Sequence, residues 1–172
     1  QWDILLLSTD AHIALHTLLG KTCQLHTALS DGSRTTTTGL INQAALLGSE
    51  GGLARYKLHV VDWTWMLGQS MASRVWQDTS VLDIVGSIFQ RYGPQAAWSV
   101  SDEVGPFLAQ AHNASNRSYC VQFRETDLAF VRRLLAEEGL SWRIEEHAGS
   151  PAKHRMVIFA NSSQPGTFPE DY

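Results

Sequence analysis

Cysteine is scarce in this sequence of 172 residues, which contains only Cys23 and Cys120. Two thiols cannot form the framework of several disulfide bonds that holds small secreted domains together. Both cysteines lie in apolar, alternating segments, where a free thiol packs as a small apolar side chain. The sequence therefore predicts folding in a reducing compartment, and its first residues show no signal-peptide pattern.

Charged residues and long apolar runs are scarce as well. Lys and Arg number 13 and Asp and Glu number 17, so the net charge is −4 and no basic cluster indicates nucleic-acid binding. No apolar run reaches the ~18 residues of a membrane-spanning helix, so we expect no integral membrane segment. Charged residues make up 17% of the chain, against about 25% in typical domains. A surface with so little charge favours burial against partner proteins.

Sequence motifs of catalysis are missing. No glycine-rich loop precedes an expected helix, and no Gly-x-Ser-x-Gly nucleophile elbow occurs. His12 and His16 have the spacing of metal ligands on one face of a helix, with Asp10 nearby. However, Ile13 stands where a zinc protease needs its glutamate. We therefore predict no catalytic residue, no bound cofactor and no metal site.

The first third of the chain alternates as β-strands do. Strands are expected over residues 2–7, 23–29, 34–38, 39–47 and 55–61. Asp31-Gly32 is a strong hairpin signal, because both central positions of such a turn favour positive φ. Short strands at this spacing predict a small β-barrel domain over residues 1–65.

Helical periodicity begins after this segment. Ser80 is expected to cap a helix whose apolar stripe covers residues 81–92. Thr126 is expected to cap a second helix over residues 127–138, and Gly139 to follow its C-terminus.

Further strands are expected beside these two helices, over residues 119–123, 140–147 and 155–160. Residues 95–117 have no regular pattern, and the Ser-, Pro- and Gly-rich segment 161–172 is predicted to be a linker. Residues 66–160 are therefore interpreted as a smaller α/β domain with two helices, and the overall fold class is α+β.

Three of the six tryptophans, Trp63, Trp65 and Trp76, cluster where the pattern changes from β to α. Trp63 and Trp65 would project from one face if the preceding strand continued through them. They are interpreted either as a core that joins the two halves or as an anchor between subunits, where tryptophan is favoured.

Two long segments resemble signatures of the VgrG family, the spike proteins of the type VI secretion system. One is YCVQFRETDLAFVRRLLAEEG at 119–139, and the other is RYKLHVVDWTW at 55–65 followed by RVWQDTSVLDIV at 74–85. The similarity extends back through Leu19-Gly20-Lys21, the Asp31-Gly32 turn and Gly39, so it covers nearly the whole chain. The sequence departs from the family pattern at Ala129 and at Trp142-Arg143.

The resemblance implies a tube-type β domain and the following α/β domain from a VgrG head. Heads of this family are homotrimers that cap the hexameric tube protein, and effector or adaptor proteins are further partners. Such a chain would be a structural, non-enzymatic component that delivers effectors across membranes. It would assemble in the bacterial cytoplasm and then be secreted through the type VI apparatus.

Structural or interface roles are expected for a set of residues in and around the matching segments. These residues are Trp63, Trp65, Trp76, Ser80, Tyr119, Gln122, Arg124, Glu125, Thr126, Asp127 and Gly139. Arg124 and Glu125 are expected to fix the turn from strand to helix. Three alternatives stay open: a baseplate hub or late-control protein of a contractile phage tail, a cell-wall hydrolase domain, and a small adaptor for effectors.

Overall fold

The computed structural model describes residues 1–110 and 116–160, so the linker expected at 161–172 lies outside the described residues. The chain divides into two compact units. The first comprises Gln1–Trp65 and Glu146–His154, and the second comprises Met66–Glu145 and the chain from Arg155 onward. Among the described residues, no helix is both long enough and apolar enough to cross a bilayer.

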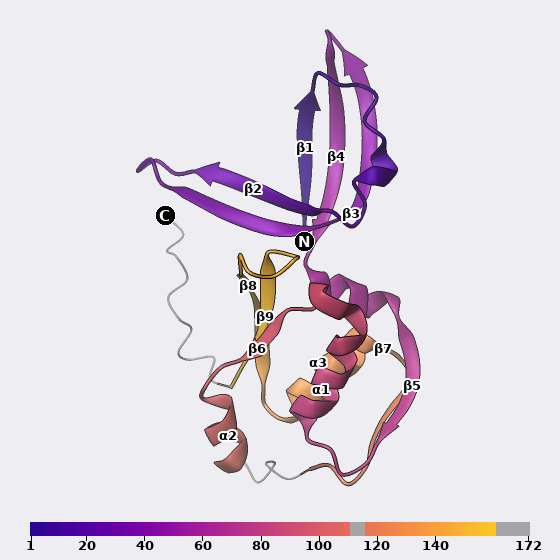
Figure 1. The fold of residues 1–172 in the computed structure, drawn as a ribbon, viewed down its shortest axis with the longest axis vertical. Coiled ribbons are helices and arrows are strands. Elements are labelled where there is room, and N and C mark those ends of the chain that lie inside the picture. Colours follow the sequence, from indigo (N-terminus) through magenta and orange to yellow (C-terminus); the bar gives the residue numbers. More distant parts are fainter. Residues whose placement is uncertain (111–115, 161–172) are drawn as a thin grey trace. The chain divides into compact units, whose positions relative to one another are not determined.

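The first unit contains one antiparallel sheet of four strands in the order β1-β4-β3-β2. Its strands are β1 (Trp2–Ser8), β2 (Thr22–Ala28), β3 (Arg34–Glu50) and β4 (Leu53–Val61). Asp31-Gly32 turns the chain between β2 and β3, and Gly32 has the positive φ of 84° that such turns favour. Figure 1 shows β3 running from its hairpin with β2 into its pairing with β4.

The barrel expected over residues 1–65 is not confirmed, because the sheet of the described residues is open. β1 and β2 lie at opposite edges of the sheet and do not pair with each other. The long strand β3 is shared by two partners, and its register with β4 shifts between Ile41 and Gln43 and between Leu46 and Gly48. Such bulges bend and twist a strand. The sequence pattern shows the strands but not whether the outermost two meet.

One face of this sheet forms the core of the first unit. Ile41, Leu58 and Val60 are buried there. The partly buried apolar residues packed around them are Trp2, Ile4, Leu6, Leu18, Cys23 and Ala44. Gly39 permits a close approach, since a Cβ at this position would lie 2.5 Å from Val60 Cγ1 and 2.9 Å from the Val61 carbonyl oxygen.

In its described residues, the second unit has a two-stranded sheet, a three-stranded sheet and three α-helices. The two-stranded sheet pairs β5 (Met71–Trp76) with β7 (Cys120–Thr126), and the other has the order β6-β9-β8. Its strands are β6 (Trp98–Val100), β8 (Ser141–Glu146) and β9 (His154–Phe159). The helices are α1 (Val81–Phe89), α2 (Val104–Gln110) and α3 (Asp127–Glu137).

Several of these elements differ from the sequence-based expectation. Strand β5 was not expected, and the segment 95–117, expected to be irregular, contains β6 and α2. The α-helical hydrogen bonding of α1 ends at Phe89 rather than Tyr92, and a 3₁₀-helix follows over Gln90–Gln95. Gly93 inside that segment has a non-helical backbone with φ of 62°. These elements are short, so they provide too few turns for a clear periodicity.

The 3₁₀-helix η2 (Trp63–Gln69) follows β4, so the strand does not continue through the two tryptophans. The strand alternation therefore stops at Val61, and Trp63 and Trp65 do not share an environment. The Trp63 side chain is fully buried, whereas Trp65 is 38% exposed. The condition for a shared strand face, a continued β4, is therefore not met.

Both helix caps predicted from the sequence are present. The Ser80 hydroxyl accepts a hydrogen bond from the Asp83 backbone N–H at 3.2 Å and donates to the Asp83 carboxylate at 2.6 Å. The Thr126 hydroxyl accepts from the Ala129 N–H at 3.2 Å. Each bond satisfies one of the backbone N–H groups that a helix N-terminus leaves without a partner. Gly139 follows α3 with a φ of 69°, as an αL residue after a helix does.

Replacing Thr126 by alanine is expected to lower the free energy of unfolding by about 1 kcal/mol, because Ala129 N–H loses its acceptor. Urea denaturation followed by circular dichroism measures this change. Thr35→Ala is the matched control, since Thr35 is an exposed strand residue. Equal denaturation midpoints for Thr126→Ala and the unmodified chain would contradict the role of this cap.

Candidate assembly site

The structure does not assemble the metal or catalytic candidates weighed from the sequence. His12 and His16 are both exposed, and they lie in a loop and in a 3₁₀-helix (Leu15–Thr17) rather than on one face of an α-helix. Over residues 1–110 and 116–160, no group of three or more His, Cys, Asp or Glu side chains is arranged to hold a metal ion. The geometry that matters lies instead in one buried ion pair, one strand-to-helix turn and two exposed apolar surfaces.

Asp127 is the centre of a buried polar network at the start of α3. Its carboxylate, which is fully buried, accepts hydrogen bonds from Arg74 Nη1 at 2.8 Å, Gln122 Nε2 at 2.7 Å and the Tyr92 hydroxyl at 2.7 Å. Burial opposes ionisation, but the bonds from Gln122, Tyr92 and Arg74 outweigh it and lower the pKa of Asp127 below its ordinary 3.8. The network ties β5, β7, α3 and the 3₁₀-helix after α1 together within the second unit.

The expected set of turn residues therefore separates into two groups. In the first group, Gln122 and Asp127 belong to the buried polar network and Thr126 caps α3. Arg124 acts differently: its φ of 48° is unusual for a non-glycine residue, and its N–H donates to the Ser73 hydroxyl at 3.2 Å. The register of β5 with β7 shifts at this point, so Arg124 belongs to a bulge. Glu125 forms an ion pair with Arg133 at 2.7 Å.

The bulge leaves an apolar surface on the outer face of the β5–β7 sheet. Phe123 is 67% exposed, and the Arg124 guanidinium lies 5.4 Å from the centre of its ring. Tyr119, Met71 and Val75 are also exposed large side chains of this ribbon. Trp76 faces the other way, stacking on Phe130 with ring centres 5.2 Å apart. Sequence reasoning missed Phe123 because nothing in the motif marks which strand face is solvated.

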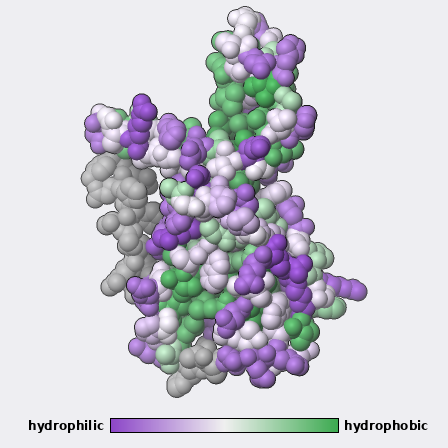
Figure 2. Space-filling model, in the orientation of Figure 1, coloured by the Kyte–Doolittle hydropathy of each residue, from purple (hydrophilic) through white to green (hydrophobic). Residues whose placement is uncertain are grey.

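The first unit has its own exposed apolar surface, the leucine face, which consists of Leu5, Leu7 and Leu47. Their exposed fractions are 72%, 63% and 50%. Together with Leu6 and Arg55 they line a shallow depression of about 120 Å³. Figure 2 shows apolar surface over this part of the sheet. The sequence carried a signal for it, because the unbroken apolar run Ile4–Leu7 is typical of a strand buried on both faces.

His154 closes the first unit beside Trp63. The histidine is fully buried, and its Nε2 accepts a hydrogen bond from the Trp63 backbone N–H at 2.9 Å. Thr38 lies next to the histidine. The N–H and hydroxyl of Thr38 donate to the two Glu146 carboxylate oxygens at 2.8 and 2.7 Å. Burial lowers the pKa of His154 below its ordinary 6.5, and the nearby carboxylates of Asp62 and Glu146 only partly offset this.

The free energy of unfolding is therefore expected to fall as the pH drops below about 6.5. The unfolded chain binds a proton on His154 in this range while the folded unit does not, so acid favours unfolding. The stability that neutral His154 provides is present above pH 6.5 and is lost as the pH falls through the lower pKa of the folded state. Urea titrations between pH 8 and 5 measure the slope.

His154→Gln serves as the comparison, because its amide oxygen can still accept from Trp63 while its side chain does not titrate. We expect a smaller loss of stability between pH 6.5 and 5 in this variant. His26→Gln is the matched control at an exposed position. An unchanged slope in His154→Gln would rule out His154 as the source.

Comparisons with solved structures give the class of fold. The E. coli c3393 protein, described as a type VI secretion component with structural similarity to the T4 tail proteins gp27 and gp5, superposes with a TM-score of 0.72. The match covers 94% of this chain and 42% of that chain at 24% identity. The 43 kDa tail protein of prophage MuSo2 from Shewanella oneidensis gives 0.62, covering 91% and 43% at 15% identity. The described chain thus has the fold of a tail-hub fragment.

The family follows from sequence. The model of the phage tail baseplate hub (GPD) family matches residues 1–170, so this chain belongs to that family. The type VI secretion system spike protein VgrG1b of Pseudomonas aeruginosa is 30% identical over 162 residues, which are 91% of this chain and 20% of the relative. This chain therefore spans about a fifth of the length of that relative.

Proposed function

We propose that this chain forms part of the head of a type VI secretion spike, where it has a structural and non-enzymatic role. Three copies would pack around a threefold axis and cap the hexameric tube protein. Effector or adaptor proteins would be carried with the assembled spike. Assembly would take place in the bacterial cytoplasm, before export through the apparatus. The family match and the curated relatives named as spike proteins support this assignment.

The leucine face is the structural observation that carries the proposal. Large apolar side chains at 72%, 63% and 50% exposure in one patch are typical of a surface that a partner covers. Leu5 and Leu7 also lie on β1, an edge strand whose outer backbone groups have no neighbouring strand in the described sheet. A neighbouring subunit would cover both the side chains and the strand edge.

The hub of a contractile phage tail is the second candidate, because the family model is named for that protein and a prophage tail protein shares the fold. Deletion of the gene in its native host separates the two machines. Loss of tube-protein export indicates a secretion spike, whereas loss of tailed particles indicates a phage hub. VgrG1b, the c3393 protein and the MuSo2 tail protein are named as secretion or tail components, and none of the three is named as a hydrolase.

A double substitution of Leu5 and Leu7 by lysine tests the surface. In the protein that carries this chain, we expect export of the tube protein to fall at least about tenfold, because two ammonium groups cannot be buried in an apolar interface without partners. Gln24→Lys, at an exposed position of β2, is the control for added charge. Normal export by the Leu5/Leu7 variant, at equal abundance, would contradict the proposal.

A further inference from the structure

Strand β5 has a free edge. In the described part of the chain it pairs with β7 and with no other strand. The Asp127 N–H donates to the Ser70 carbonyl at 2.9 Å, just before the first residue pair of the β5–β7 ladder. The backbone groups of Ser70 therefore point toward β7, and this fixes the direction of the backbone groups along the rest of β5. Backbone groups of alternate residues point to opposite sides of an antiparallel strand. Ala72, Arg74 and Trp76 therefore face β7, and the N–H and C=O groups of Ser73 and Val75 face outward.

The outer edge of β7 is protected, in contrast to that of β5. Val121 is the β7 residue paired with Val75. Its carbonyl already accepts a hydrogen bond from Arg133 Nη2 at 3.1 Å, so it is not available to another strand. The same guanidinium is held by Glu125 at 2.7 Å and by Glu137 at 3.1 Å. A long charged side chain on an edge is a common device against unwanted strand pairing. Among the described side chains, the β5 edge carries no such device.

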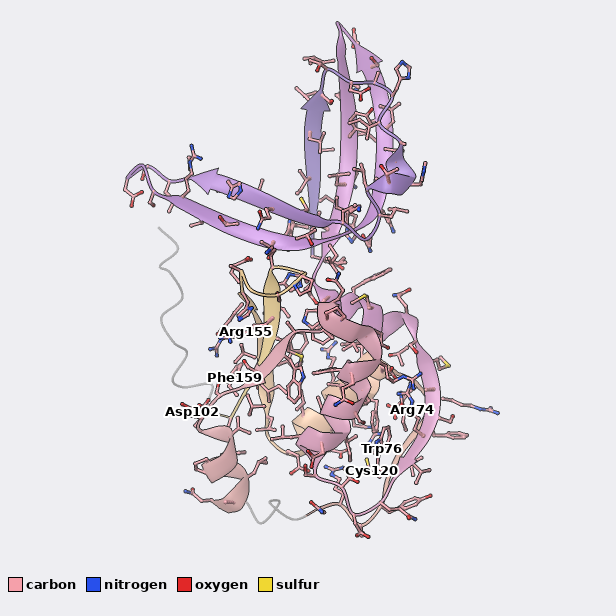
Figure 3. All side chains as sticks on the ribbon, viewed as in Figure 1. Arg74, Trp76, Asp102, Cys120, Arg155 and Phe159 are labelled. Carbon is pink, nitrogen blue, oxygen red and sulfur yellow. The ribbon has the colours of Figure 1, made fainter. Side chains whose placement is uncertain are left out.

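A groove runs beside this open edge. Its lining residues are Arg74, Val75 and Trp76 from β5, Ser87 and Ile88 from α1, and Arg91 from the 3₁₀-helix that follows, and its volume is about 210 Å³. Trp76 is fixed in the wall by its Nε1–H bond to the Ser87 hydroxyl at 3.2 Å. Figure 3 shows Arg74 and Trp76 on the part of β5 that faces the helices. The groove thus offers mixed apolar and polar walls along a strand with unused backbone donors and acceptors.

The charge of the groove is positive. Arg74 is neutralised by Asp127, whereas Arg91 is exposed and takes part in no ion pair among residues 1–110 and 116–160. An uncompensated guanidinium at the rim favours a carboxylate on the occupant. If the β5 edges of two copies of this chain paired with each other around a twofold axis at the middle of the strand, the Arg91 side chains of the two copies would approach each other. Like charges disfavour that arrangement.

We propose that the β5 edge binds an extended, acidic segment of a partner protein as a third strand of the β5–β7 sheet. Main-chain bonds to Ser73 and Val75 supply affinity, as in other cases of strand addition. Alternate side chains of the added strand point to opposite faces. One set enters the groove and places a carboxylate beside Arg91, and the other set covers Met71 and Val75. This proposal lies in the second unit and does not depend on the proposed function.

Two end-blocked, fluorescein-labelled peptides of nine residues test the site. Both alternate valine and threonine, and the central residue is glutamate in one and lysine in the other. Fluorescence anisotropy with the full chain is expected to show binding of the glutamate peptide at least about tenfold tighter than the lysine peptide. Slower amide hydrogen exchange at Ser73 and Val75 on binding locates the strand.

Two variants separate backbone pairing from charge. Val75→Pro removes an outward N–H, which an edge strand tolerates, and is expected to abolish binding of both peptides while circular dichroism stays unchanged. Arg91→Glu is expected to reverse the preference, and Arg132→Glu, an exposed charge on α3, is the matched control.

Equal affinity for the two peptides, or full binding by folded Val75→Pro, would overturn the proposal. So would a dimer in analytical ultracentrifugation that Val75→Pro dissociates, because the edge would then be occupied by a second copy. The Arg91→Glu result still decides the case if Val75→Pro fails to fold, since an unreversed preference also overturns it.

Discussion

Asp127→Asn is expected to lower the free energy of unfolding by about 3 kcal/mol, because a buried ion pair loses one partner and leaves the other uncompensated. The carboxylate is fully buried and Arg74 keeps only 19% of its side-chain surface exposed. An amide would also present an NH₂ donor where Gln122 and Tyr92 already donate. The substitution therefore removes charge and introduces a donor–donor contact in one step.

The pH dependence provides a second readout. The pKa of Asp127 is lowered in the folded state, so the unfolded chain takes up a proton first as the pH falls. Its contribution is present above the ordinary value of 3.8 and is lost as the pH falls through the lower folded pKa. Urea titrations from pH 7 to 3 should show a shallower acid dependence for Asp127→Asn. Asp102→Asn, an exposed aspartate of the same unit, is the control, and equal losses in both variants would refute the network's importance.

Trp63→Ala is expected to lower the free energy of unfolding by about 3–5 kcal/mol, as large-to-small substitutions of buried aromatic residues do. Trp63 is among the largest fully buried side chains of the described chain, and its removal leaves a cavity beside His154. Its neighbour Trp65 offers a matched control, because the same side chain there is 38% exposed. Trp65→Ala should therefore cost about 1 kcal/mol or less.

Thermal and urea unfolding of the two tryptophan variants measures this difference. Circular dichroism is the suitable probe, because each substitution also changes the intrinsic fluorescence. A loss of stability in Trp65→Ala as large as that in Trp63→Ala would contradict the conclusion that the 3₁₀-helix buries Trp63 and leaves Trp65 exposed. A loss below about 1 kcal/mol in Trp63→Ala would show that the site collapses around the missing ring.

Much of the fold was predictable where local sequence and packing agree. The alternation at Arg55–Val61 appears as β4, with Tyr56, Leu58 and Val60 buried on one face. The caps at Ser80 and Thr126 depend only on contacts three residues away, so the sequence contains all the necessary information.

The failures have a common physical cause, which is that they depend on distant partners. Strand β5 alternates in burial but not in hydropathy, because Trp76 packs inside while the apolar Met71 and Val75 are exposed outside. The barrel is not confirmed, and closure depends on whether β1 meets β2, which no local pattern encodes. The same holds for the site: Gln122 and Asp127 belong to one motif, but Arg74 is 53 residues from Asp127 and only folding brings them to 2.8 Å. The structural and interface roles expected for the other motif residues stay predictions.

The division of the chain into units has a consequence for the order of events during translation. Thr38 and Trp63 obtain their partners Glu146 and His154 only after the whole segment Met66–Glu145 has been synthesised. At ~5–20 residues per second, this delay is roughly 4 to 16 seconds. During that time Glu146 cannot yet accept from Thr38, and His154 cannot yet accept from the Trp63 N–H. The first unit, whose strands leave the ribosome first, can therefore be completed only after the segment Met66–Glu145 of the second unit has been made.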